Sequence, residues 1–155
     1  MMINKRLLRE TPVRALQLLC APKMTDPKNA DYLGFGTVTD LGGGKCSIVT
    51  TIDKSLAPLD LWGYITPINI HLDRLPLYAL FEKLAPKVTL RTPFKMSDVF
   101  HQIESAYGIR FDARDYIETT ITSMSGDTIL VRAGDQSLRW YGHYMLKLHE
   151  VGNAQ

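Results

Sequence analysis

Three side chains in the second half of the chain have the types and spacing that could bind a metal ion: Asp98, His101 and Glu104. Steps of three residues place side chains on one face of a helix, and imidazole and carboxylate groups are metal ligands. The same residues also have a structural explanation, in which Asp98 caps the helix and Glu104 is a solvated charge. No second cluster supplies further ligands, so we expect no metal and no other cofactor.

The stretch Gly42-Gly43-Gly44-Lys45 has the composition of a phosphate-binding loop. That pattern requires a glycine five positions before its last glycine, where this chain has Thr39. It also requires serine or threonine after the lysine, where this chain has Cys46. The glycines are better explained as the turn of a β-hairpin.

The remaining nucleophiles, acids and bases form no recognisable catalytic group. Cys20 and Cys46 are far apart and belong to no C-x-x-C motif, so we expect small buried hydrophobic residues. No G-x-S-x-G sequence is present, and the acidic residues are scattered through expected loops and caps. Three histidines lack a Cys, Asp or Glu at a ligand spacing: His71, His143 and His149. We therefore expect a protein that is not an enzyme.

Two aromatic stretches, 61–72 and 138–148, share leucine, tryptophan, glycine and tyrosine ahead of a mostly apolar run. Such runs predict strands. Alternation along a strand would bury half of the aromatic side chains and direct the others outward, where Trp and Tyr favour protein interfaces. The candidate interface residues are Trp62, Tyr64, Trp140, Tyr141, His143 and Tyr144.

Local signals predict the elements of the first half. Thr11 can cap a helix whose first turn suits Pro12. Pro67 cannot donate to a ladder, so the strand that contains it is expected to lie on an edge or to bulge there. That strand is expected to pair antiparallel with 45–53. The expected elements are a helix over 12–20, a loop or single helical turn over 23–30, hairpin strands over 34–39 and 45–52, and the strand 61–72.

The second half begins with a joint over 73–96. Leu77, Leu80, Phe81 and Leu84 have the spacing of one apolar helical face. Ser97 or Asp98 is expected to cap a second helix, which Gly108 ends. The expected elements are helices over 76–84 and 97–108, one turn over 112–116, and strands over 117–123, 127–133 and 139–149, the last two paired.

The two halves also suggest an internal duplication. Residues 35–55 align without a gap on 117–137, with five identities that include Gly44 with Gly126. We therefore predict an α+β fold of two similar units, each a helix with three antiparallel strands. The units would be 1–72 and 97–155, joined by a short helix within 73–96, and together they could form one compact domain.

The composition excludes several classes of partner. The 155 residues are 45% hydrophobic and 22% charged, which is typical of a globular protein. The net charge is +2 and the basic residues are dispersed, so we expect neither nucleic acid nor membrane as a partner. The first ten residues are too charged for a signal peptide, which predicts synthesis in the cytoplasm.

A longer pattern covers residues 73–148. It comprises Leu77-x-x-Leu80-Phe81, Pro86-x-Val88-Thr89, Thr92-Pro93, Asp98-Val99-x-x-x-Ile103, Tyr107-Gly108-Ile109, Asp115-Tyr116-Ile117 and Tyr141-Gly142. This pattern resembles an uncharacterised domain family of virion structural proteins from large tailed bacteriophages. In that family no catalytic residues are assigned, and the domains occur singly or in tandem. The first half departs from the pattern at Ala21-Pro22, where the second half has Tyr107-Gly108-Ile109.

The resemblance implies a structural component of a phage virion, in the tail or baseplate region. Its partners would be other virion structural proteins and further copies of itself in a symmetric assembly. It would be made in the host cytoplasm and end in the virion. Two other classes stay open: a small phage-encoded enzyme or host-directed factor, and a cytoplasmic adaptor protein.

Overall fold

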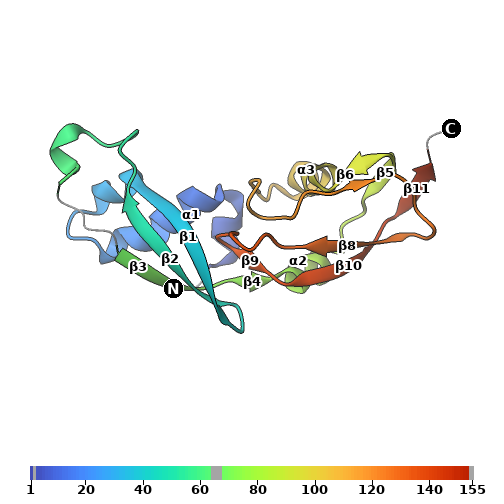
Figure 1. The fold of residues 1–155 in the computed structure, drawn as a ribbon, viewed down its shortest axis with the longest axis horizontal. Helices are drawn as coiled ribbons and strands as arrows, with labels where there is room; N and C mark the ends of the chain where they lie inside the picture. Colours follow the sequence, from blue (N-terminus) through green and yellow to red (C-terminus); the bar gives the residue numbers. More distant parts are fainter. Residues whose placement is uncertain (2, 64–67, 154–155) are drawn as a thin grey trace.

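The computed structural model of the chain describes residues 1, 3–63 and 68–153. Helices and antiparallel strands are both present, which confirms the predicted α+β class. Two lobes lie end to end along the long axis of the molecule (Figure 1).

Lobe 1 is a three-stranded antiparallel sheet with helix α1 packed against it (Figure 1). Its strands, in the order β1-β2-β3, are β1 (Leu33–Gly42), β2 (Lys45–Ile52) and β3 (Ile68–Asp73). Its α-helix is α1 (Pro12–Cys20), and its 3-10 helices are η1 (Lys5–Arg9), η2 (Ala21–Lys23), η3 (Pro27–Tyr32) and η4 (Leu59–Leu61).

Lobe 2 combines two helices with four separate strand pairs. The helices are α2 (Leu77–Leu84) and α3 (Met96–Tyr107). The antiparallel pairs are β6 (Phe94–Lys95) with β7 (Thr120–Ile121), and β8 (Thr128–Arg132) with β10 (His143–Lys147). The parallel pairs are β4 (Leu75–Pro76) with β9 (Trp140–Tyr141), and β5 (Thr89–Thr92) with β11 (Glu150–Asn153).

The start of α1 and the end of α3 follow the predicted local signals. The Thr11 hydroxyl accepts a hydrogen bond from Arg14 N at the start of α1, as expected. Helix α3 ends at Gly108, whose φ of 70° suits glycine. Its N-cap is Lys95 and not Ser97 or Asp98, so the predicted cap residue was wrong. The Asp98 carboxylate still closes the first turn, because it accepts from Lys95 N at 2.8 Å.

The strand expected over 61–72 is shorter than predicted. Residues 59–61 form η4, and Trp62 has helical φ and ψ values of −63° and −27°. The Trp62 indole donates to Ala57 O at 3.1 Å, a local contact that an extended strand could not make over this spacing. Strand β3 pairs antiparallel with β2, and this predicted pairing is confirmed. The predicted bulge at Pro67 lies outside the described residues.

The hairpin expected between 117–123 and 127–133 is not formed. Strand β7 pairs instead with β6, and Thr119 O accepts from Met96 N at 2.9 Å. Strand β6 is the partner of β7 in place of 127–133 because it supplies hydrogen-bond partners to the β7 backbone and also buries Phe94 in the core. The expected pairing of 127–133 with 139–148 is confirmed as β8 with β10. The duplication is therefore not confirmed, since lobe 1 has one three-stranded sheet and lobe 2 has strand pairs.

Two hydrophobic cores meet at the junction of the lobes. The core of lobe 1 includes Leu16 and Ile48, and it also takes in Leu138 from the second half of the chain. The core of lobe 2 is built largely from α2, α3, β8 and β10. Leu8 and Leu75 pack against both cores, so the packing is continuous across the junction.

A close contact between the β1–β2 turn and β9 explains one of the turn glycines. Gly44 has a φ of 84°, and a Cβ added there would lie 2.5 Å from Tyr141 Cε1. Gly43 also has a positive φ, of 61°, but a Cβ added there would meet nothing within 4 Å. Gly44 thus allows the Tyr141 ring of lobe 2 to rest against the hairpin of lobe 1.

We predict that Gly44→Ala destabilises the protein more than Gly43→Ala. Both substitutions place alanine in the left-handed region, at a cost of about 1–2 kcal/mol. Only Gly44→Ala also forces the Tyr141 ring aside, which adds roughly 1–3 kcal/mol as overpacking does in a core. Urea denaturation of the two variants measures the difference, and equal free energies of unfolding would show that the ring contact is unimportant.

Candidate functional site

Strand β8 has an edge without a strand partner. In an antiparallel pair, successive residues alternately direct their backbone groups toward the partner strand and away from it. Ala133 N donates to Gly142 O at 2.9 Å, so the odd-numbered positions face β10. Thr128 and Leu130 therefore direct their N–H and C=O groups away from β10. Among the described residues, β10 is the only strand paired with β8.

Strand β7 presents a second free edge opposite the first. Thr119 O faces the β6 side, since it bonds Met96 N. The next residue, Thr120, therefore directs its backbone groups away from β6. The side chain of Thr120 is exposed, and β7 has β6 as its one partner within the part of the chain described.

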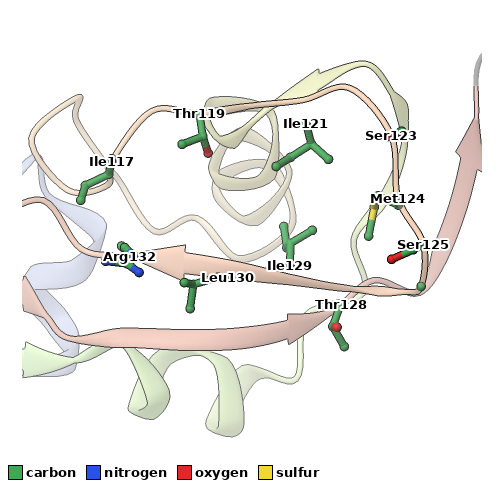
Figure 2. Close-up of a pocket in the computed structure, with 11 residues that line it drawn as sticks. Ile117, Thr119, Ile121, Ser123, Met124, Ser125, Thr128, Ile129, Leu130 and Arg132 are labelled. Carbon is green, nitrogen blue, oxygen red and sulfur yellow. The ribbon is translucent and has the colours of Figure 1, made fainter.

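A groove of about 480 Å³ lies between the segment 117–126 and β8. Figure 2 shows Ile121 and Ile129 from its two walls directed toward the space between them. Ile117 N donates to Arg132 O at 3.0 Å and joins the two walls at one end. The lining is aliphatic and hydroxyl-bearing, with one charged side chain. The lining residues are Ile117, Thr119, Ile121, Ser123, Met124, Ser125, Gly126, Thr128, Ile129, Leu130 and Arg132.

The free edge of β1, in contrast, is covered by side chains from elsewhere in the chain. Arg114 donates to Phe35 O at 3.0 Å and to Gly36 O at 2.8 Å. The Gln136 side chain both donates to Val38 O and accepts from Val38 N. These side chains from lobe 2 replace the missing strand. No comparable side chain bonds the described backbone groups of β8 that face the groove.

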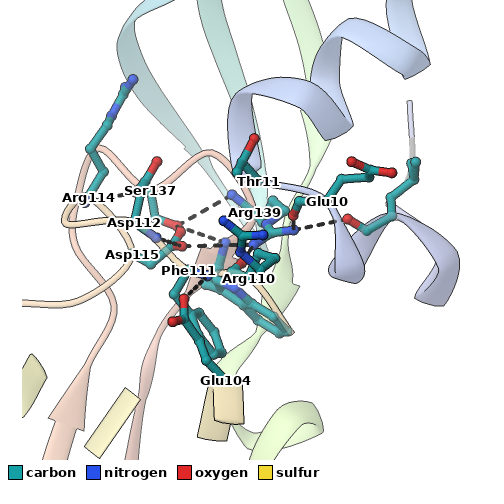
Figure 3. Close-up of polar contacts among 12 residues, drawn as sticks. Glu10, Thr11, Glu104, Arg110, Phe111, Asp112, Arg114, Asp115, Ser137 and Arg139 are labelled. Atoms are coloured by element: carbon teal, nitrogen blue, oxygen red, sulfur yellow. Dashed lines mark hydrogen bonds and ion pairs between the residues drawn. The ribbon is translucent and has the colours of Figure 1, made fainter. Parts of the chain in front are cut away.

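At the junction of the lobes, a buried guanidinium bonds segments from both halves of the chain (Figure 3). Arg139 is fully buried and donates to Leu7 O at 3.0 Å and Glu10 O at 2.9 Å in the N-terminal segment. It also donates to Arg110 O after α3, and its Nη2 lies 4.0 Å from the Asp115 carboxylate. One side chain therefore fixes segments that are more than one hundred residues apart.

Asp115 is the carboxylate partner in this cluster. It is also fully buried, and it accepts from Ser137 Oγ at 2.7 Å and from Asp112 N at 3.0 Å. Loss of hydration, followed by the charge of Asp112, raises the pKa of Asp115 to about 6. The hydrogen bonds from Asp112 N and Ser137 and the charge of Arg139 oppose this rise. Because both side chains are inaccessible, their role is to position segments of the chain.

We predict that Asp115 makes the stability depend on pH. Its folded-state pKa of about 6 lies above the ordinary aspartate value of 3.8, so its contribution to stability is full below pH 3.8 and is lost as the pH rises through 6. The total loss is about 3 kcal/mol, at ~1.4 kcal/mol for each pKa unit. Asp115→Asn cannot titrate. Urea denaturation should therefore show the chain losing about this much stability relative to Asp115→Asn between about pH 4 and about pH 7.

Asp135→Asn, which changes an exposed carboxyl in the neighbouring loop, is the matched control. It should keep the pH dependence of the unmodified chain. A pH-independent difference between the chain and Asp115→Asn would contradict the prediction.

The candidate interface residues do not form one outward face. Trp140 is 1% exposed, so its predicted outward position was wrong: the β4–β9 pairing holds it in the core. Tyr144 is half-buried, with its ring stacked on Phe81 at 5.2 Å. Tyr141 is half-buried against Gly44. Trp62 and His143 are exposed, in different lobes, and Tyr64 lies outside the described residues.

The candidate metal ligands are accounted for by structural contacts. Glu104 accepts from Phe111 N at 2.7 Å, Asp98 accepts from Lys95 N in the first turn of α3, and His101 is exposed. Among the described residues, no group of three His, Cys, Asp or Glu side chains could hold a metal ion. Cys20 and Cys46 are buried, as predicted, and burial raises the pKa of both thiols.

Sequence reasoning missed the positioning residues Arg114, Asp115, Ser137 and Arg139. Each is an isolated polar residue in a loop or beside a short strand, and no local spacing relates residue 115 to residue 139. The alignment of 35–55 on 117–137 did include Ser137, but only because it is identical to Ser55 and not for any positioning role. A buried arginine has no signature in a single sequence.

Comparison with family models matches residues 55–153 to DUF7941, a family of unknown function. The chain belongs to this family. The DUF7941 match contains the whole groove beside β8 together with Asp115, Ser137 and Arg139. No curated protein and no solved structure matches the chain. None of the described helices is long and apolar enough to cross a membrane.

Proposed function

We propose that this DUF7941 protein is a non-enzymatic structural component of a tailed-phage virion, in the tail or baseplate region. It acts through contacts with other virion proteins and with further copies of itself. The observation that supports this role is the open strand edge of β8 beside the groove. The resemblance of residues 73–148 to virion structural proteins supports placing this role in a phage virion.

An unpaired strand edge is a site for another polypeptide. The N–H and C=O groups of Thr128 and Leu130 can bond an added strand, and added strands are a common mode of protein recognition. Proteins normally blunt such edges with charge, proline or a covering segment. Leu130 is 38% exposed and carries none of these protections. The groove can therefore accept an extended segment of a neighbour.

The support behind the edge suits a structural role. Ile129 and Val131 anchor β8 in the core of lobe 2, and the Arg139 cluster fixes lobe 2 to the N-terminal segment. A neighbour bound at β8 would thereby be held in a defined position relative to lobe 1. Defined geometry between neighbours is what a tail or baseplate component must supply.

We predict that the chain copurifies with assembled particles in a fixed copy number, measured by quantitative mass spectrometry of purified phage. Leu130→Lys should reduce that number about tenfold, because losing ~1.4 kcal/mol of contact energy is tenfold in an equilibrium constant. A lysine at this edge opposes strand addition.

Met145→Lys is the matched control, since Met145 is opposite Leu130 in the ladder and is 55% exposed on the strand away from the groove. It should leave incorporation unchanged. A chain that stays free in the lysate and is absent from particles would refute the structural role and favour an adaptor or host-directed factor.

A further inference from the structure

A second cavity, of about 350 Å³, lies where the two lobes meet. One wall is the N-terminal segment with η1, and another is the side of α2 that carries Leu80 and Lys83. The β4–β9 pair supplies Leu75 and Trp140, and the chain after α3 supplies Ile109. The cavity is separate from the groove beside β8, because none of the described residues lines both.

The inner surface of this cavity is apolar. Leu8, Leu80 and Leu84 line it together with Leu75, Ile109 and Trp140. Its volume is within the roughly 300–1,000 Å³ of small-molecule sites, which are also mainly apolar with a few polar groups that orient the ligand. The cavity can therefore take an aliphatic chain.

The outer part of the cavity is cationic. Lys5 and Arg9 of η1 and Lys83 of α2 line it, and all three are exposed. None of them forms a salt bridge with another described residue, and no Asp or Glu lines the cavity. Three unpaired cations beside an apolar space favour a ligand that is apolar at one end and anionic at the other.

We propose that this cavity binds a single-chain aliphatic carboxylate, such as a free fatty acid. The chain lies against Leu8, Leu80 and Leu84, and the carboxylate lies near Lys5, Arg9 and Lys83. Binding bridges η1 and α2, and so adds a contact across the lobe junction. This inference stands independently of the proposed role in the virion.

Dodecanoate is the probe, and Trp140 is the reporter. The chain has two tryptophans, so Trp62→Phe leaves Trp140, which lines the cavity, as the only indole. Dodecanoate, kept below its micelle concentration, should change the Trp140 fluorescence with saturation at one ligand per chain. Decanoate should bind roughly tenfold more weakly, because two fewer methylenes are buried. Calorimetry on the unmodified chain gives the same comparison without the substitution.

The head group is tested with dodecan-1-ol and dodecyltrimethylammonium, which share the aliphatic chain. Both should bind at least about tenfold more weakly than dodecanoate, since neither pairs with the cations. Equal binding of all three would overturn the proposal and indicate nonspecific apolar adsorption.

Two substitutions test the location. Lys83→Glu should weaken dodecanoate binding about tenfold or more, whereas Lys87→Glu, at an exposed lysine outside the cavity, should not. Ala79→Phe fills the cavity from α2 and should abolish binding, with circular dichroism as the check on folding. If Ala79→Phe fails to fold, the comparison of Lys83→Glu with Lys87→Glu tests the location by itself. Unchanged binding in Lys83→Glu would overturn the proposal.

Discussion

The buried guanidinium of Arg139 is the interaction on which the arrangement of the molecule depends. It donates to carbonyls at Leu7 and Glu10 and to the carbonyl of Arg110 after α3, and it lies beside Asp115. A buried charge is costly unless hydrogen bonds and an opposite charge compensate it, so these segments cannot separate without exposing or stranding it. The free-energy cost of leaving the Arg139 charge without its partners therefore holds the segments at the junction together.

A second buried arginine reinforces the junction from lobe 1. Arg74, which follows β3, donates to Ser137 O at 3.2 Å, and its backbone N donates to Gly44 O at 2.9 Å. Leu75 N in turn donates to Arg139 O at 2.7 Å. The two arginines thus hold the loop before β9 between the lobes. Leu138 of this loop lies in the core of lobe 1, and Trp140, the first residue of β9, lies in the core of lobe 2.

The fixed junction also decides which strand edges are covered. Arg114 and Gln136 reach the edge of β1 only because the loops that carry them are held against lobe 1. Strand β7 pairs with β6 and not with β8, and the groove lies between β7 and β8 as a result. One edge is closed and the other left open by the same long-range arrangement.

The sequence by itself determined the elements whose signals are local. Thr11 and Pro12 start α1, Gly108 ends α3, and the glycines at 42–44 turn the β1–β2 hairpin. The phosphate-loop alternative was set aside from spacing and residue type, and the metal alternative for want of a second group of ligands. The repeat is not confirmed, because similar turn and strand residues do not specify which strands pair.

Only the tertiary structure decided the pairing of β7 with β6, the burial of Trp140 and the cluster around Arg139. The choice between β6 and β8 as partner of β7 depends on where α3 packs, and several residues that fix this packing are far apart in sequence. A buried ion cluster likewise depends on desolvation, which is a property of the assembled fold and not of any one segment. Both candidate binding sites arise in this way, from elements that meet only after folding.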